Sequence, residues 1–227
     1  MIGIALFTLI IALLGAGAGY LLYQLLTNFQ PGSNKINQDL ERMRSEIDPW
    51  VGELVPWTQQ EMELLSHHRV NQELKKGIAP TAKGVLTSIY NEPMMAYSYK
   101  RYVSPNRNAL LLVRTSNHEW VYRIRDKKVE VMIDRQVVGD IREDGRFYHR
   151  KSNQLLAQIQ RGEDELILPV LVGEREVGSL SVPEAPSKIY DRAFQLLAPM
   201  TEEEEALFLS LSAYELIQKE LPLRKKK

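Results

Sequence analysis

The sequence predicts a mainly β protein, in which an N-terminal transmembrane helix and a short helical stalk precede an antiparallel β-barrel of about 11–12 strands around a hydrophobic C-terminal helix. Three observations predict it. No charged side chain precedes Lys35, short runs with a period of two fill the chain from Gly84 onward, and the final helix is apolar all round. The expected segments are an anchor at 1–28, a linker and helical stalk at 29–82, a barrel domain at 83–220 and a basic tail at 221–227.

The N-terminal segment is expected to anchor the chain in the cell membrane. Residues 2–28 form an apolar run longer than the roughly 20 residues that a helix needs to cross a bilayer. A signal peptide would need a positive n-region before the run, and no Lys or Arg occurs there. Basic residues follow the run, beginning at Lys35, so the positive-inside rule predicts a single-pass protein with a cytoplasmic C-terminal domain.

Two features favour a parallel homodimer. Gly15 and Gly19 form a small-xxx-small pair, which lets two helices approach closely in lipid, although glycine is also simply common in membrane helices. The stretch 35–48 reads as a charged helix with a heptad seam. The candidate self-association residues are Gly15, Gly19, Ile36, Leu40, Met43 and Ile47.

A second helix is expected after the stalk. Thr58 and Glu61 form a capping box that predicts a helix from about residue 59 to Lys75. His67 and His68 would lie on it about 100° apart, so they cannot share one metal ion. We expect a structural or surface role for both and no metal site.

Periodicity changes from 3.6 to 2 at Gly84, and short strands then follow one another with turns between them. In His118–Arg125, Trp120 and Tyr122 would point to one face and charged residues to the other, as in a half-buried strand. The expected strands are 84–91, 94–102, 109–115, 118–125, 128–133, 136–142, 146–149, 153–160, 165–172, 175–182 and 193–198.

The last helix distinguishes a barrel from a sandwich. Thr201 and Glu204 form a capping box, and residues 206–217 are apolar in nearly every direction. Such a helix is buried on all sides, and at about twelve residues it is too short to cross a membrane. A β shell around one apolar helix explains both properties.

This element order resembles the tubby C-terminal-like superfamily, which includes tubby proteins and phospholipid scramblases, over residues 84–218. The resemblance lies in Val137–Ile141 (VVGDI), Glu176–Leu180 (EVGSL), the strand around Phe194 and the helix 207–217. It implies a barrel around a hydrophobic C-terminal helix and a non-enzymatic, membrane-associated binding domain. The chain departs from scramblases in its N-terminal anchor, its lack of cysteine and its lack of a Ca²⁺ loop.

The charges balance overall but not locally. The chain has 227 residues with 29 Lys+Arg and 29 Asp+Glu, so bulk positive charge for nucleic-acid binding is absent. Residues 100–151 carry thirteen basic and seven acidic side chains, whereas 152–222 carry five and thirteen. Blocks of opposite charge suit assembly with a protein partner. Cysteine is absent, which excludes disulfides and thiolate chemistry.

The sequence contains no motif for catalysis, so we expect no catalytic, cofactor-binding or metal-binding residue. His118 is expected as a half-buried strand residue and His149 as part of a basic turn. The first hypothesis is a membrane-tethered scaffold that binds a protein partner or a larger complex; the alternatives are an anionic-lipid binder and an enzyme with an unrecognised site. The candidate lipid contacts are Lys100, Arg101, Arg107, Arg150, Lys151, Arg224, Lys225, Lys226 and Lys227.

Overall fold

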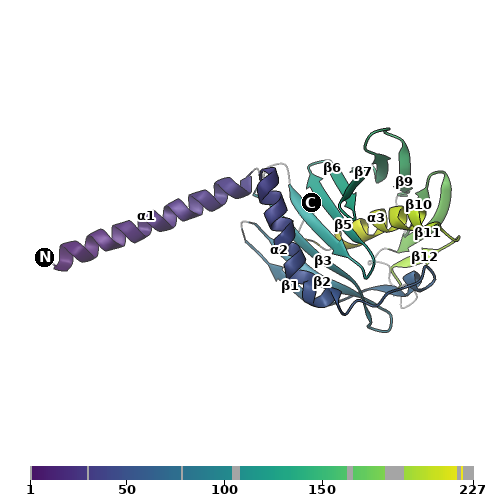
Figure 1. The fold of residues 1–227 in the computed structure, drawn as a ribbon, viewed down its shortest axis with the longest axis horizontal. Helices are drawn as coiled ribbons and strands as arrows, with labels where there is room; N and C mark the ends of the chain where they lie inside the picture. The colour runs from purple at the N-terminus through teal and green to yellow at the C-terminus, as the bar shows by residue number, and fades with distance from the viewer. Residues whose placement is uncertain are drawn as a thin grey trace.

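The fold is that of a computed structural model, which describes residues 2–29, 31–77, 79–103, 108–162, 166–181, 192–218 and 221. In this part of the chain, twelve antiparallel strands form a nearly closed barrel in which each strand pairs with the next (Figure 1). The helices are α1 (Ile2–Phe29), α2 (Ser33–Val51) and α3 (Glu202–Gln218), and a 3₁₀ turn, η1, spans Glu61–Leu64. The strands are β1 (Leu65–Lys75), β2 (Thr81–Ser88), β3 (Pro93–Arg101), β4 (Ala109–Arg114), β5 (Glu119–Arg125), β6 (Lys128–Ile133), β7 (Gln136–Arg142), β8 (Arg146–His149), β9 (Leu155–Ile159), β10 (Ile167–Val172), β11 (Arg175–Ser181) and β12 (Phe194–Leu196).

The predicted barrel strands are confirmed. Each of the eleven predicted runs overlaps one of β2 to β12, and three of them, β6, β7 and β8, have the predicted bounds. In β5, Trp120 and Tyr122 are fully buried in the barrel interior, as the alternation predicts.

The predicted helix at 59–75 is wrong. The capping box of Thr58 and Glu61 forms, because the Thr58 amide donates to Glu61 Oε2 at 2.8 Å, but it opens only the short η1 turn. Residues 65–75 then become β1, which pairs with β2. Two register shifts in that ladder and a positive φ at Asn71 interrupt the period of two, so the alternation typical of a strand is hidden in the sequence. The barrel therefore begins at Leu65 rather than at 83.

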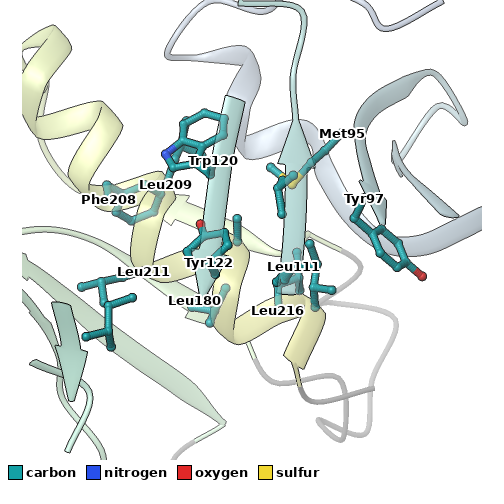
Figure 2. Close-up of a cluster of buried hydrophobic side chains, with 14 of the residues drawn as sticks. Met95, Tyr97, Leu111, Trp120, Tyr122, Leu180, Phe208, Leu209, Leu211 and Leu216 are labelled. Atoms are coloured by element: carbon teal, nitrogen blue, oxygen red, sulfur yellow. The ribbon is translucent and has the colours of Figure 1, made fainter. Parts of the chain in front are cut away.

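Helix α3 fills the barrel. Figure 2 shows Phe208, Leu209 and Leu211 of α3 beside Trp120 and Tyr122 of β5, and all five are at most 1% exposed. The Trp120 indole N–H donates to Ser210 Oγ at 3.1 Å, and the Tyr122 hydroxyl donates to the Ser210 carbonyl at 2.9 Å. These buried polar groups are thus paired, and the predicted core helix is confirmed.

The first and last strands meet through a short contact. The Ala193 amide donates to the Leu65 carbonyl at 2.7 Å, and Ser66 bridges to Arg192. Further along, Glu63 of η1 accepts the Leu196 amide at 2.6 Å. These bonds pair backbone groups that an open sheet edge would leave unpaired.

Helix α2 packs on the outside of the sheet formed by β2 to β5, and it is not a free stalk. Its apolar residues form a second buried cluster with Val85, Ala96, Leu110, Leu112 and Val121. This packing corrects the expected coiled-coil seam: Ile36, Leu40, Met43 and Ile47 are each at most 8% exposed against the chain's own barrel. The spacing is the same because any helix that covers a flat apolar surface buries residues at positions i, i+3, i+4 and i+7.

Helix α1 projects away from the barrel (Figure 1). It has 28 residues, and its side chains from Ile10 to Tyr23 are all exposed. Within the described residues, no helix has both the length and the apolar character that a membrane span requires. The transmembrane role expected for residues 1–28 remains a prediction.

Candidate functional site

The order of the strands divides the turns between the two ends of the barrel. Because each strand runs antiparallel to the next, turns that follow odd-numbered strands lie at one end and turns that follow even-numbered strands lie at the other. We call these the near end and the far end. The near end includes the turns at 75–81, 101–109, 125–128 and 142–146; the far end includes those at 88–93, 133–136, 149–155 and 172–175.

Side-chain bonds fix the direction of α2 between these ends. Near its start, Asp39 accepts hydrogen bonds from Lys100 Nζ at 2.7 Å and from the Tyr102 hydroxyl at 2.8 Å, both at the near end. Further along the helix, Arg44 donates to Glu119 at 3.0 Å at the far end. Helix α2 therefore begins at the near end, and the chain reaches the barrel from α1 on that side.

A small hollow marks where the chain enters. It has a volume of about 330 Å³, and Pro31 and Ile36 border it together with Asn108 and Arg125. Pro31 lies two residues after the last residue of α1. The attachment point of α1 is thus beside the near-end turns that contain residues 108 and 125.

The carboxylate of Asp39 is buried, with 3% of its side chain exposed. Burial alone would raise the pKa of Asp39, but the hydrogen bonds from Lys100 and Tyr102 outweigh it and hold the pKa below the ordinary value. Lys35 adds a second ammonium at 3.2 Å. Asp39 is therefore an ionised, fully paired group that holds α2 on the barrel.

The near end carries cations that have no counter-ion in the described part of the chain. Lys75 and Lys76 lie at the β1–β2 turn, Arg101 ends β3 and Arg125 ends β5, and none of the four has an ion pair there. Lys127, with Glu143 at 3.6 Å, is also highly exposed. Among the described near-end turns, these cations outnumber the exposed carboxylate that has no ion pair there, Asp126, so positive charge predominates at this end.

Two large apolar side chains are also exposed at the near end. Leu74 is 51% exposed just before Lys75, and Leu166 is 43% exposed just before β10. Both are at the near end. The near end therefore presents apolar side chains as well as cations.

Negative charge predominates at the far end, although Arg135 and Lys151 are exposed there without an ion pair among the described residues. Acidic side chains lie at the start of α3 and in the turns that follow even-numbered strands. Several of them have no ion pair among the described residues: Glu53, Glu92, Glu174, Glu202 and Glu203. Val55, Tyr90 and Leu197 are exposed among them at 38%, 67% and 57%. The Val55 amide donates to the Pro93 carbonyl at 2.8 Å, which places it beside the β2–β3 turn that carries Tyr90.

One cavity of about 350 Å³ opens at the near end. Its wall includes Ile124, Ile141 and Leu211, and its polar groups include Arg161 and Glu215. Arg161 donates two hydrogen bonds to the Glu215 carboxylate, at 3.1 and 2.7 Å, and Glu215 has 2% of its side chain exposed. The Arg161 guanidinium is therefore already neutralised by its own carboxylate and is not a free anion-binding group. Lys127 and Arg142 also line the cavity.

The candidate lipid contacts do not form one surface. Lys100 is paired with Asp39 and only 14% exposed, so it is not a free cation. Arg101 lies at the near end. Arg150 and Lys151 lie at the far end, where Arg150 pairs with Glu130 at 3.3 Å. Arg107, Arg224, Lys225, Lys226 and Lys227 lie outside the described residues.

Sequence reasoning missed Lys75, Lys76 and Arg125. The available signal was the strand order, because turns separated by an odd number of strands must lie at opposite ends. It also missed Asp39, whose position on the apolar face of α2 between Ile36 and Met43 indicates a buried carboxylate that needs a partner.

The histidines are all tied to neighbours. His67 and His68 lie on β1, not on a helix, and they contact Ser181 and Thr87 at 2.8 and 3.2 Å. His118 Nδ1 lies 2.7 Å from Asp134, and His149 Nδ1 lies 2.9 Å from Ser152. The residues that the structure describes include no group of three His, Asp or Glu side chains placed to hold a metal ion.

The two glycines expected to pair helices lie on an open surface. A Cβ atom added at Gly15 or Gly19 would meet nothing within 4 Å in the described chain. Their role in self-association stays a prediction.

Comparisons with known proteins give no relative: no family model, no curated protein and no solved structure matches this chain.

Proposed function

We propose that this chain is a single-pass membrane protein, anchored by α1, whose cytoplasmic barrel binds a protein partner at its far end and catalyses no reaction. The observation that carries the proposal is the polarity of the barrel. Helix α1 joins it at the near end, while the far end combines exposed apolar side chains with unpaired carboxylates.

The anchor is supported by the sequence and by exposure. The stretch 2–28 has no charged side chain, and helix α1 covers it with 28 residues, or about 42 Å at 1.5 Å per residue. Leu13 and Leu14 are 64% and 69% exposed, although large apolar side chains in water are unfavourable. A bilayer would cover them.

The partner site is supported by the far end. Val55, Tyr90 and Leu197 offer apolar contact area, and Tyr is among the residues enriched in interfaces. The surrounding carboxylates favour a partner with Lys or Arg around its own apolar contact. A barrel held at its near end would turn this surface away from the membrane.

A non-catalytic role is supported at one of the contacts between a hydroxyl and an imidazole, the contact of Ser181 in β11 with His67 in β1. Ser181 Oγ lies 2.8 Å from His67 Nε2, but it also lies 2.6 Å from the Arg192 carbonyl. A carbonyl cannot donate, so the hydroxyl proton points to it and His67 must be the donor to Ser181. The pair therefore joins β1 to β11 and does not activate a nucleophile.

The resemblance to the tubby C-terminal-like superfamily stays part of this proposal. Its support is the order of elements, with a nearly closed antiparallel barrel and a buried C-terminal helix. Binding of anionic lipid is the second candidate function, and the cations of the near end favour it.

The partner is tested by photo-crosslinking in cells that express the full chain. A photoreactive amino acid at Tyr90 should crosslink to a discrete protein, whereas the same group at Asn37, which is exposed on α2, should not. Equal crosslinking from both positions, or none from Tyr90, would contradict a far-end partner site.

The orientation is tested by thiol labelling, because the chain has no cysteine of its own. A Ser116→Cys variant, exposed in the β4–β5 turn, should resist a membrane-impermeant reagent in intact cells and react after permeabilisation. Ready labelling in intact cells would place the barrel outside the cytoplasm.

A further inference from the structure

We infer that the near end of the barrel lies against the bilayer and binds anionic lipid headgroups as a second membrane contact. The inference rests on the proposed anchor, because α1 brings this end to the membrane. It goes further by assigning the cations of the near end to a lipid surface and by fixing how the barrel sits on it.

Only a short stretch of chain separates α1 from the near end of the barrel. Pro31 follows α1 by two residues and borders the same hollow as Asn108 and Arg125. Two residues of extended chain span about 7 Å at most. The near-end turns are therefore held within a short distance of the point where α1 leaves the bilayer.

The near end offers cations that are free to contact an anionic surface. Lys75, Lys76, Arg101 and Arg125 have no ion pair within the described chain, so their interaction with an anionic surface would cost no internal bond. Each basic residue near such a surface favours contact by about fivefold, the equivalent of about 1 kcal/mol. At the far end the five unpaired carboxylates outnumber the exposed cations without an ion pair, Arg135 and Lys151, so an anionic surface favours contact with the near end.

Two exposed apolar side chains add to the contact expected with the bilayer. Leu74 is 51% exposed immediately before Lys75, and Leu166 is 43% exposed at the start of the β10 segment. Exposure of these two side chains to water is unfavourable, whereas their burial at the headgroup–acyl boundary is favourable. The aliphatic stems of neighbouring lysines can lie along the same boundary while the ammonium groups reach the phosphates.

The near-end cavity is not where these four cations lie. The near-end cavity holds Arg161, whose guanidinium is bound at two points by Glu215. A ligand phosphate would have to displace that buried carboxylate. Lys127 and Arg142 also line this cavity, but Lys75, Lys76, Arg101 and Arg125 lie outside it on the turns. The contact that these four make is therefore with a lipid surface of negative charge and not with one enclosed headgroup.

The test is lysine footprinting of the full chain reconstituted in vesicles. One set of vesicles is phosphatidylcholine, and the other is phosphatidylcholine mixed with phosphatidylserine. An amine-reactive acetylating reagent is added from outside to vesicles recovered by flotation, and acetylation at each lysine is followed by mass spectrometry. Lys151, exposed at the far end, is the control within the same sample.

We expect acetylation of Lys75 and Lys76 to be several-fold slower in the phosphatidylserine vesicles, with the difference lost at high salt, and Lys151 to react equally in both. Equal rates for Lys75 and Lys76 in the two vesicles would overturn the inference. Protein that fails to float with either vesicle would instead contradict the proposed anchor, so the two failures are distinguishable.

A pair of variants separates local charge from net charge. Arg125→Glu at the near end should raise the acetylation rates of Lys75 and Lys76 in the phosphatidylserine vesicles. Arg150→Glu makes the same change of charge at the far end and should leave the acetylation rates of Lys75 and Lys76 unchanged. Equal effects of the two variants would overturn the assignment of the contact to the near end.

Discussion

The Asp39 carboxylate of α2 lies 2.7 Å from Lys100 Nζ of β3. This pair joins the helix that follows α1 to the strand that ends at the near end of the barrel. With the Arg44–Glu119 pair further along the helix, it sets the direction in which α2 crosses the sheet. The position of α1 beside the near end follows from that direction.

Replacement of Asp39 should therefore loosen α2. Asp39→Asn removes the charge from a buried, doubly hydrogen-bonded group, and we expect a loss of about 2 kcal/mol in the free energy of unfolding, since hydrogen bonds to charged groups contribute roughly 1.5–3 kcal/mol. Urea unfolding of the full chain in detergent, followed by tryptophan fluorescence, measures it. Arg42→Ala, which breaks an exposed pair with Glu46 on the same helix, should cost no more than about 0.5 kcal/mol. Similar losses in both variants would contradict the role of Asp39.

The Asp39 contribution should depend on pH in one direction. The pKa of Asp39 is below its ordinary value in the folded chain, because its hydrogen bonds outweigh burial, so the group stabilises the fold fully above its unfolded pKa of about 3.9 and loses this effect as pH falls through the folded pKa. The difference in unfolding free energy between the native chain and Asp39→Asn should be constant from about pH 5 to 8 and shrink below about pH 4. A difference in unfolding free energy that grows as the pH falls would contradict the lowered pKa of Asp39.

The core position of α3 can be tested at Leu211, which is 1% exposed. Leu211→Ala should cost about 3 kcal/mol, because it leaves a cavity among packed side chains, and Leu211→Asp should prevent folding by burying an unpaired charge. Glu203→Ala, at an exposed position of the same helix, should change stability by less than about 0.5 kcal/mol. A Leu211→Asp chain with a native unfolding transition would show that α3 is peripheral.

Close backbone approach should make Gly139 hard to replace. A Cβ at this position would overlap the Tyr148 carbonyl oxygen, a backbone atom that cannot move without separating β7 from β8. We expect Gly139→Ala to lower the free energy of unfolding by more than about 2 kcal/mol. Gly52→Ala is the matched control: its φ is −66° and an added Cβ meets nothing within 4 Å. Equal stability of the two variants would contradict the tight β7–β8 packing.

The barrel strands and the core helix could be predicted because their periodicities are local. Residues 119–125 alternate except at Val121, which is buried under α2, and 206–217 are apolar in nearly every direction, so each segment indicates its own environment. Strand β1 could not be predicted, because bulges around Asn71 hide its alternation and pairing with β2 overrides the helix signal of Thr58 and Glu61. The existence of α2 was predictable, but its partner was not, since one apolar seam suits a coiled coil and a sheet equally.

The candidate site was only partly accessible from the sequence. Charge blocks place cations along residues 100–151, yet Lys100 and Lys151 belong to opposite ends of the barrel. Strand order alone would have separated them. The position of α1 at one of these ends depends on the Asp39–Lys100 contact between residues 61 positions apart, which no local pattern reveals.

We expect the near end of the barrel to face the membrane. Because the chain has no native cysteine, single fluorophores can be placed at Gly77→Cys in the β1–β2 turn and at Glu174→Cys in the β10–β11 turn. In the full chain reconstituted in vesicles, a quencher attached to lipid headgroups should quench the label at residue 77 strongly and the label at residue 174 weakly. Equal quenching at the two positions, or stronger quenching at residue 174, would contradict the account.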